Sequence, residues 1–162
     1  MRLLTTLLNL LPLTLSSPTP TQSTSSTTPS SSNTFQIFDF RAYISSNPTT
    51  DGNYNIASFM IPENGFTCAV ISEEPVYSDI TWYPCNPPSS GSEETWSFRI
   101  SEGFGQVVLR KEWSVNGMYF TGFAPQDTYW SEGYGGNVTS FEGGKFYDRF
   151  EPWGFEITSV IG

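Results

Sequence analysis

Apolar and polar residues alternate in short runs along most of the chain after Phe35, and clusters of Gly, Pro, Asn and Asp separate these runs. A period of two residues places alternate side chains on opposite faces of a β-strand. No segment in this region keeps apolar residues at helical spacing for the ten or so residues that a helix needs. The pattern therefore predicts an all-β fold, an antiparallel β-sandwich or β-barrel, over residues 35–162.

The expected strands cover residues 35–45, 54–62, 66–72, 80–84, 96–100, 107–113, 118–124 and 155–161. The alternation predicts which side chains share a face in each strand. These sets are Phe38, Phe40, Ala42 and Ile44 in the first strand, Ala57, Phe59 and Ile61 in the second, Ile80 and Trp82 in the fourth, and Trp96, Phe98 and Ile100 in the fifth. The pattern loosens after the seventh strand and leaves the register between residues 125 and 154 open.

The segment Val115-Asn116-Gly117-Met118 is the strongest hairpin signal in the chain. Asn and Gly tolerate the positive φ angles of a type I′ turn, whose twist matches that of the flanking strands. We therefore expect the chain to reverse at Asn116-Gly117 and the two flanking strands to pair.

Both cysteines lie between Phe66 and Cys85, with Cys68 in one expected strand and Cys85 at the end of the next. The polar loop between the strands, from Ser72 to Asp79, has a Pro at its centre. Two cysteines in a secreted chain have only each other, which predicts an intramolecular disulfide worth about 3 kcal/mol of folding stability. A reactive or metal-binding pair is the alternative, but the spacing is not CxxC and the chain has no His.

Residues 1–16 have the layout of a secretory signal peptide: one Arg, an apolar run from Leu3 to Leu15, and small residues at Ser16 and Ser17. A membrane anchor is the alternative, but the apolar run is shorter than the roughly 20 residues that a spanning helix needs. The end of the sequence lacks the long apolar tail of a lipid-anchor signal. These features predict a secreted, extracellular protein, which could associate with a cell wall.

Residues 17–34 contain only Ser, Thr and Pro apart from Gln22 and Asn33. Without apolar residues the segment cannot offset the entropy lost on ordering, which predicts a disordered stalk. Such tracts in secreted proteins are often O-glycosylated, and an unmodified linker is the other reading.

Removal of the signal peptide would take Arg2 with it and leave 6 basic against 16 acidic residues, a net charge of −10. This charge would repel phosphate backbones and anionic lipids, so we expect neither a nucleic-acid partner nor a membrane partner.

The absence of His excludes Ser-His-Asp and Cys-His catalysis as well as His-ligated zinc. Carboxylate pairs could still hydrolyse glycosides, and the acidic residues considered for that role are Glu102, Glu112, Glu142 and Glu156. Among 16 acidic residues such pairs arise readily, and a solvated acidic surface is the favoured interpretation. No DxDxDG calcium loop is present, and we expect no catalytic residue, metal or cofactor.

Aromatic side chains suggest a second class of function. Trp82, Trp96 and Trp113 lie in alternating strands and are expected in the core. Trp130 and Trp153 lie in Gly- and Pro-rich segments, where recognition residues are common, and they are candidate surface contacts for a partner or a sugar ring.

Asn137-Val138-Thr139 is the one usable N-glycosylation sequon, because Pro48 blocks Asn47-Pro48-Thr49. We therefore expect Asn137 to accept a glycan if the position is exposed.

The series YNIASFMI, FTC, WYPC, WSFRI and VVLRKEW, between residues 54 and 113, resembles the Alternaria major-allergen family of secreted fungal proteins. The resemblance covers residues 35–124 and, more weakly, the final strand. It implies a compact fungal β-barrel without catalytic residues, in which Cys68 and Cys85 match the first disulfide of the family. The second cysteine pair and the dimer-linking N-terminal cysteine of that family are absent here, so a monomer or a non-covalent dimer is expected.

The resemblance also implies an allergen-like or effector-like protein that acts by binding. The implied partners are a plant defence protein of the thaumatin-like class or a small flavonoid-type ligand. A carbohydrate-binding or cell-wall-associated β-sandwich module is the alternative function.

Overall fold

The structure, a computed structural model, describes residues 33–46, 54–89, 91–128, 130 and 136–162. The predicted signal peptide and all but the last two residues of the Ser/Thr/Pro segment lie outside these ranges. The first strand begins at Thr34, one residue before the predicted start of the domain.

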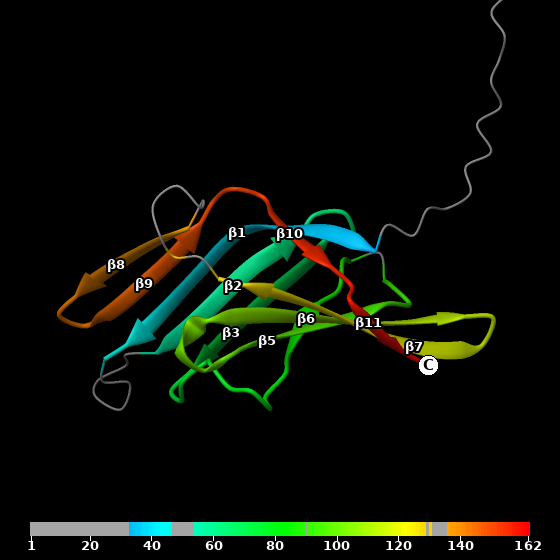
Figure 1. Ribbon diagram of the computed structural model, residues 1–162, viewed down its shortest axis with the longest axis horizontal. Helices are drawn as coiled ribbons and strands as arrows, with labels where there is room; N and C mark the ends of the chain where they lie inside the picture. Colours follow the sequence, from blue (N-terminus) through cyan, green and yellow to red (C-terminus); the bar gives the residue numbers. More distant parts are fainter. Residues whose placement is uncertain (1–32, 47–53, 90, 129, 131–135) are drawn as a thin grey trace, which may run out of the picture. The chain divides into compact units, whose positions relative to one another are not determined.

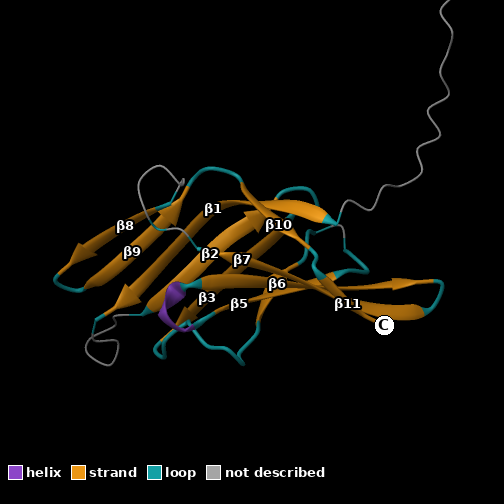
Figure 2. Ribbon diagram, in the orientation of Figure 1, coloured by secondary structure: helices purple, strands orange, loops and turns teal. Residues whose placement is uncertain are grey.

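The described residues form an all-β, antiparallel fold, as the alternating pattern predicted. One curled sheet forms a half-barrel (Figures 1 and 2). Turns and loops connect the strands, and the helical element among the described residues is a three-residue 3-10 turn, η1 (Glu102–Phe104). The strands are β1 (Thr34–Ser45), β2 (Asn55–Ile61), β3 (Phe66–Ser72), β4 (Tyr83–Asn86), β5 (Thr95–Ile100), β6 (Gln106–Val115), β7 (Met118–Asp127), β8 (Asn137–Phe141), β9 (Gly144–Arg149), β10 (Trp153–Glu156) and β11 (Ser159–Ile161).

The strands follow the order β11-β7-β6-β5-β4-β3-β2-β1-β9-β8, and β10 also pairs with β1. Residues 155–161, expected as one strand, therefore form parts of two strands with different partners. β10 pairs with the first residues of β1, whereas β11 pairs with β7 on the far side of the sheet. Two backbone hydrogen bonds support this bridge, from Ile157 N to Asn33 O at 2.7 Å and from Thr158 N to Phe123 O at 2.9 Å. The segment around Thr158 thus links the beginning of β1 with β7 across the curl.

Alternate side chains of the strands point into the curl and form the core. Phe59 on β2 and Phe98 on β5 meet there edge to face, with ring centroids 5.0 Å apart. The largest fully buried side chains are Phe40, Phe59, Phe66, Phe98, Phe155, Ile37, Ile61, Ile100, Leu109, Val76, Val107 and Asn55. The expected inward faces of β2 and β5 are confirmed by this set.

Strand β1 changes phase at a β-bulge. The register with β2 shifts between Phe38 and Arg41, and Asp39 lies there with a φ of +52°. An extra residue in one strand reverses which side chains face the core. Phe35 and Ile37 are therefore buried before the bulge, and Phe40 is buried after it. The expectation that Phe38 shares the face of Phe40 is wrong, because Phe38 pairs with the outward-facing Met60.

Residues 80–84 do not form the expected strand. Ile80 is 87% exposed, and β4 begins only at Tyr83. Trp82 and Trp113 are half-buried and lie outside the core, so the expectation for these two is wrong, whereas Trp96 is buried as expected.

The predicted hairpin and the predicted disulfide are both present. Asn116 and Gly117 have φ angles of +53° and +79°, and Val115 pairs with Met118 across the turn. Cys68 on β3 and Cys85 on β4 are directly opposed, with their Cα atoms 4.1 Å apart, and they form the disulfide.

Candidate interaction face

The outer side of strands β3, β2, β1, β9 and β8 is the main candidate site, and it is termed the open face below. The alternation of side chains along β2 explains why this face carries apolar residues. Asn55, Ala57 and Phe59 point inward, so Ile56 and Ser58 must point outward. Cross-strand pairing aligns the outward residues in three rows across neighbouring strands. The first row is Ile71, Ile56, Tyr43, Phe146 and Thr139, the second is Ala69, Ser58, Arg41, Asp148 and Asn137, and the third is Thr67, Met60 and Phe38.

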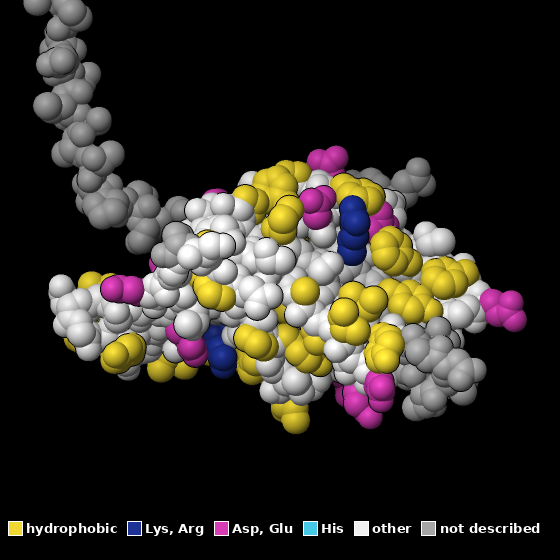
Figure 3. Space-filling view, turned by 180° about the vertical axis from the view of Figure 1, so that it is seen from behind, with side chains coloured by type: hydrophobic (Ala, Val, Ile, Leu, Met, Phe, Trp, Pro, Cys, Tyr) yellow, Lys and Arg dark blue, Asp and Glu magenta, His cyan; other side chains and the backbone are white. Residues whose placement is uncertain are grey.

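Large apolar side chains are exposed on the open face. Ile71 is 67% exposed, Met60 42% and Ile56 37%. Apolar side chains gather toward the end of the molecule where β8 and β9 lie, as the view from behind shows (Figure 3). Tyr43 is held flat beside them, because its ring stacks on Phe141 with centroids 5.6 Å apart and its hydroxyl donates to Gly143 O at 2.9 Å. The face therefore combines rigid aromatic and aliphatic groups with direct access to solvent.

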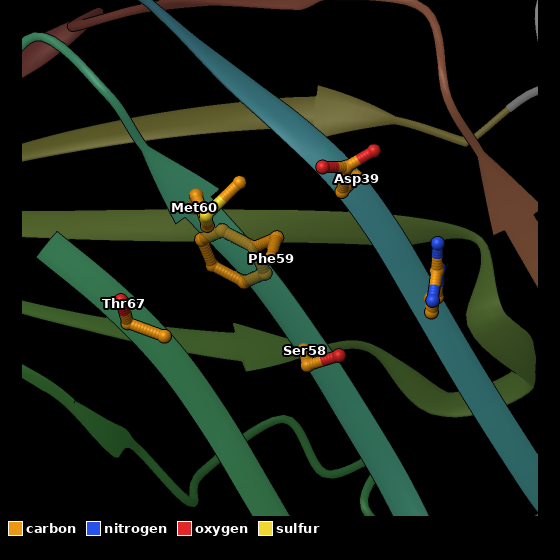
Figure 4. Close-up of a pocket in the computed structure, with 6 residues that line it drawn as sticks. Asp39, Ser58, Phe59, Met60 and Thr67 are labelled. Carbon is orange, nitrogen blue, oxygen red and sulfur yellow. The ribbon is translucent and has the colours of Figure 1, made fainter.

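Two adjoining depressions meet at Arg41 and Ser58 in the middle of the open face. The larger, of about 230 Å³, lies where the bulge interrupts the pairing of β1 with β2, and Asp39, Met60 and Thr67 surround it (Figure 4). The smaller, of about 170 Å³, extends toward the row of Ile56 and Tyr43. The bulge thus creates a shallow depression in a face that would otherwise be even.

Arg41 supplies the positive charge of these depressions. Its guanidinium carbon lies 5.3 Å from the centroid of the Phe150 ring, and its backbone is paired with Asp148. Within the described ranges the ion pairs are Arg110 with Glu112 and Lys111 with Glu94, so Arg41 makes none there. An exposed guanidinium between apolar groups is suited to receive a carboxylate or a carbonyl oxygen of a partner.

The outer side of β5, β6 and β7 differs, because the chain covers it with Trp82. We term it the covered face. The guanidinium carbons of Arg99 and Arg110 lie 5.1 and 4.8 Å from the Trp82 ring, and the Phe123 ring lies 5.9 Å from it. The Arg110 Nε group also donates to Ser97 Oγ at 2.9 Å. Because these aromatic and cationic groups already contact one another, the surface around Trp82 offers a partner few unoccupied groups to bind.

A second candidate site is a cavity of about 320 Å³ beside η1, at one end of the curl. Phe104 and Tyr147 stack there with ring centroids 4.5 Å apart, and Tyr77 and Lys145 also line the cavity. Burial, and next the charge of the neighbouring Tyr77, raise the pKa of Tyr147. Phe104 has a φ of +60°, and its carbonyl oxygen accepts hydrogen bonds from Trp130 Nε1 at 3.1 Å and from the Thr128 hydroxyl.

The two tryptophans predicted as surface contacts do not form an exposed pair. Trp153 is only 4% exposed and packs edge to face against Phe40, with centroids 5.7 Å apart, so that prediction is wrong. Trp130 is half-buried and packs against the core, with its indole N–H bonded to Phe104 O. Short strand β10 places Trp153 inside the curl, and its Gly- and Pro-rich surroundings gave no sign of that pairing.

The other predicted site residues lie on the surface. Asn137 is exposed at the start of β8. The four glutamates considered for hydrolysis are exposed on four different elements, namely η1, β6, the β8–β9 turn and β10: Glu102, Glu112, Glu142 and Glu156. Among the described residues, no three His, Cys, Asp or Glu side chains are grouped as a metal site would require.

No family model, curated protein or solved structure matches this chain. The resemblance to the Alternaria major-allergen family thus remains a prediction from the motifs between residues 54 and 113. The described part of the chain contains no helix that is long and apolar enough to cross a membrane.

Proposed function

We propose that this protein is a secreted, non-enzymatic binding protein whose open face docks onto another protein. The observation that carries the proposal is the exposure of Ile56, Met60 and Ile71 on a regular sheet, beside the depressions at Arg41. Contiguous exposed apolar groups with polar groups among them are typical of protein interaction sites.

The contrast with the covered face supports this proposal. The chain packs Trp82 onto the outer side of β5 to β7, whereas the apolar groups of the open face stay exposed. Tyr119 and Ile161 are also exposed, at the hairpin end of β7 and on β11, so the contrast concerns the area around Trp82. Exposed apolar surface lowers solubility, so its retention on the open face favours a role in recognition.

The motif resemblance supports a partner class. It favours a plant extracellular defence protein, of which the thaumatin-like class is the first to test. The open face has only shallow depressions and suits a protein surface better than a small molecule, because a small ligand needs a deep concave site.

The test uses the mature protein as bait in plant apoplastic fluid, with matched isoleucine variants. The variant Ile56→Ser/Ile71→Ser alters the open face, and Ile80→Ser alters an equally apolar side chain that is more exposed but lies off this face. We expect the double variant to reduce capture of the partner at least about tenfold, equivalent to about 1.4 kcal/mol, while Ile80→Ser leaves it unchanged. Equal capture by all three proteins would refute the open face as the docking site.

The non-enzymatic part of the proposal has a separate test. The protein is expected to release no sugars from cell-wall glycans. Hydrolysis that disappears in Glu102→Gln, Glu112→Gln, Glu142→Gln or Glu156→Gln would overturn it.

A small-ligand function is the second candidate, and the cavity beside η1 favours it. Lys145 and the stacked rings of Phe104 and Tyr147 offer one positive charge beside aromatic surfaces. This combination suits a planar phenolic or anionic aromatic compound, such as the flavonoid-type ligands that the resemblance implies. Titration with such compounds is expected to be weakened by Lys145→Glu and unaffected by Arg41→Glu, and equal effects would reject the cavity.

The carbohydrate-binding alternative loses one of its two aromatic groups, because Trp153 is buried. A glycan array that shows binding abolished by Trp130→Ala would restore this alternative, and an array without binding would remove it.

A further inference from the structure

Strand β8 lies at one edge of the sheet and lacks the usual protection of an edge. All five of its residues are exposed, and its sequence, Asn-Val-Thr-Ser-Phe, contains no charge and no Pro. An edge strand presents unpaired backbone N–H and C=O groups to any other strand, and proteins commonly blunt such edges with Lys, Pro or a bulge. Val138 and Phe141 instead add exposed apolar surface, and the register with β9 is continuous.

The N-glycosylation sequon begins at the first residue of this strand. Asn137 pairs with Asp148, which pairs with Arg41, so the Asn137 side chain belongs to the second row of the open face. Asn137 is exposed, and the hydroxyl-bearing Thr139 of the sequon is exposed as well. A bulky polar group on Asn137 would therefore stand directly at the edge of the sheet.

We propose that an N-linked glycan on Asn137 protects the edge of β8 against pairing with a second copy of this chain. In an antiparallel β8–β8 pair centred on Thr139, Asn137 of one copy faces Phe141 of the other. The glycan stem occupies the space that the incoming Phe141 side chain needs. Without the glycan, the uncharged edges of two copies pair through their backbone groups.

The modification itself is a glycosyl transfer in the secretory pathway. The Asn137 amide nitrogen forms a bond to the anomeric carbon of an oligosaccharide carried on a lipid pyrophosphate. The bond from that carbon to the pyrophosphate oxygen breaks, and the amide gives up one proton as the pyrophosphate leaves. The donor and the transferase come from the secretory pathway, so this inference depends on secretion but not on the partner of the open face.

The experiment compares secreted proteins made in a eukaryotic host that performs N-glycosylation. Peptide mass spectrometry measures occupancy of Asn137, and light scattering after size-exclusion chromatography measures the dimer dissociation constant. Thr139→Ala removes the sequon, whereas the matched variant Thr139→Ser keeps it, and Asn137→Gln removes it independently. Circular dichroism and thermal unfolding confirm that each variant is folded.

We expect wild type and Thr139→Ser to be glycosylated and monomeric. Thr139→Ala and Asn137→Gln should lower the dimer dissociation constant at least about tenfold, equivalent to about 1.4 kcal/mol. Adding Val138→Lys to Asn137→Gln should restore the monomer, because a lysine on the edge opposes strand pairing.

Three results would overturn the proposal: an unoccupied Asn137 in wild type, glycan-free variants that stay monomeric, or a dimer that Val138→Lys does not disrupt. Each leaves the proposed function intact, since partner capture is tested with Ile56 and Ile71 variants, which change neither the sequon nor strand β8.

Discussion

On the outer side of β5 to β7, Trp82 lies between Arg99 and Arg110 and against Phe123, whereas on the outer side of β1 to β3 Ile56 and Met60 remain exposed. Both regions belong to the same curled sheet and enclose the same core. The difference arises because the chain between β3 and β4 packs Trp82 onto one region only. Trp82 and Phe123 thus pack against each other on one side of the sheet, whereas Ile56 and Met60 remain exposed on the other.

The largest expected effect tests whether the two regions share one core. Phe59 lies beneath the open face and Phe98 lies on β5 of the covered region, and the two rings are in contact. Phe59→Ala and Phe98→Ala should each lower the free energy of unfolding by about 3–5 kcal/mol, because each leaves a cavity in the core. Urea unfolding measures the change. A loss below about 1 kcal/mol in either variant would indicate that the region of β1 to β3 and the region of β5 to β7 do not share one core.

A smaller effect is expected from removing the group that covers the second region. Trp82→Ala should lower the free energy of unfolding by about 2 kcal/mol, because it removes two cation–π contacts and one aromatic contact. Trp82→Phe is the control and should retain about half of that energy, since it preserves an aromatic face. If the stability of Trp82→Ala equals that of the wild type, the packing of Trp82 on β5 to β7 does not stabilise the fold.

The open face itself should contribute little to stability. Ile71→Ser is expected to change the free energy of unfolding by no more than about 0.5 kcal/mol, as is typical of exposed positions. Ile80→Ser should behave in the same way. A loss above about 2 kcal/mol for Ile71→Ser would mean that the open face is structural, and the comparison of the two faces would fail.

The smallest effect concerns alkaline pH. Burial raises the pKa of Tyr83 and of Tyr147 above the ordinary value of 10.0. The folded state therefore keeps these phenol protons at pH values where the unfolded chain loses them. The resulting stability is fully present below about pH 10 and is lost as the pH rises through the folded-state pKa values.

Tyr147→Phe should flatten this alkaline decline, as measured by urea unfolding at a series of pH values above neutrality. Tyr119→Phe, which removes a phenol from an exposed position, is the matched control. A wild-type stability that rises above pH 10 would contradict the assigned direction.

The strands with regular alternation were predictable from the sequence. Phe59 and Ile61 on β2, and Phe98 on β5, are buried as expected, because each lies in a strand with an uninterrupted period of two. The Asn116-Gly117 turn and the Cys68–Cys85 bridge depend on local residue chemistry and were predicted for that reason.

Features that depend on distant partners were not predictable. The bulge at Asp39 lies where β1 pairs with β10 before it and with β9 after it, and no residue near Asp39 indicates that change. Trp153 was misplaced for the same reason, since its strand is short and pairs with Ile37. The open face was visible only as apolar residues in the outward register of β2, such as Ile56 and Met60.

The pairing of Thr34 with Glu156 has a consequence for biosynthesis. While the chain is made, Phe35 and Ile37 leave the ribosome long before the residues that will cover them exist. These apolar residues stay uncovered in the nascent chain until the segment near residue 156 has been made and can pair with β1. Folding is therefore expected to be completed after synthesis of the domain, at the slow pace of long-range strand pairing, with chaperones holding the unfinished sheet.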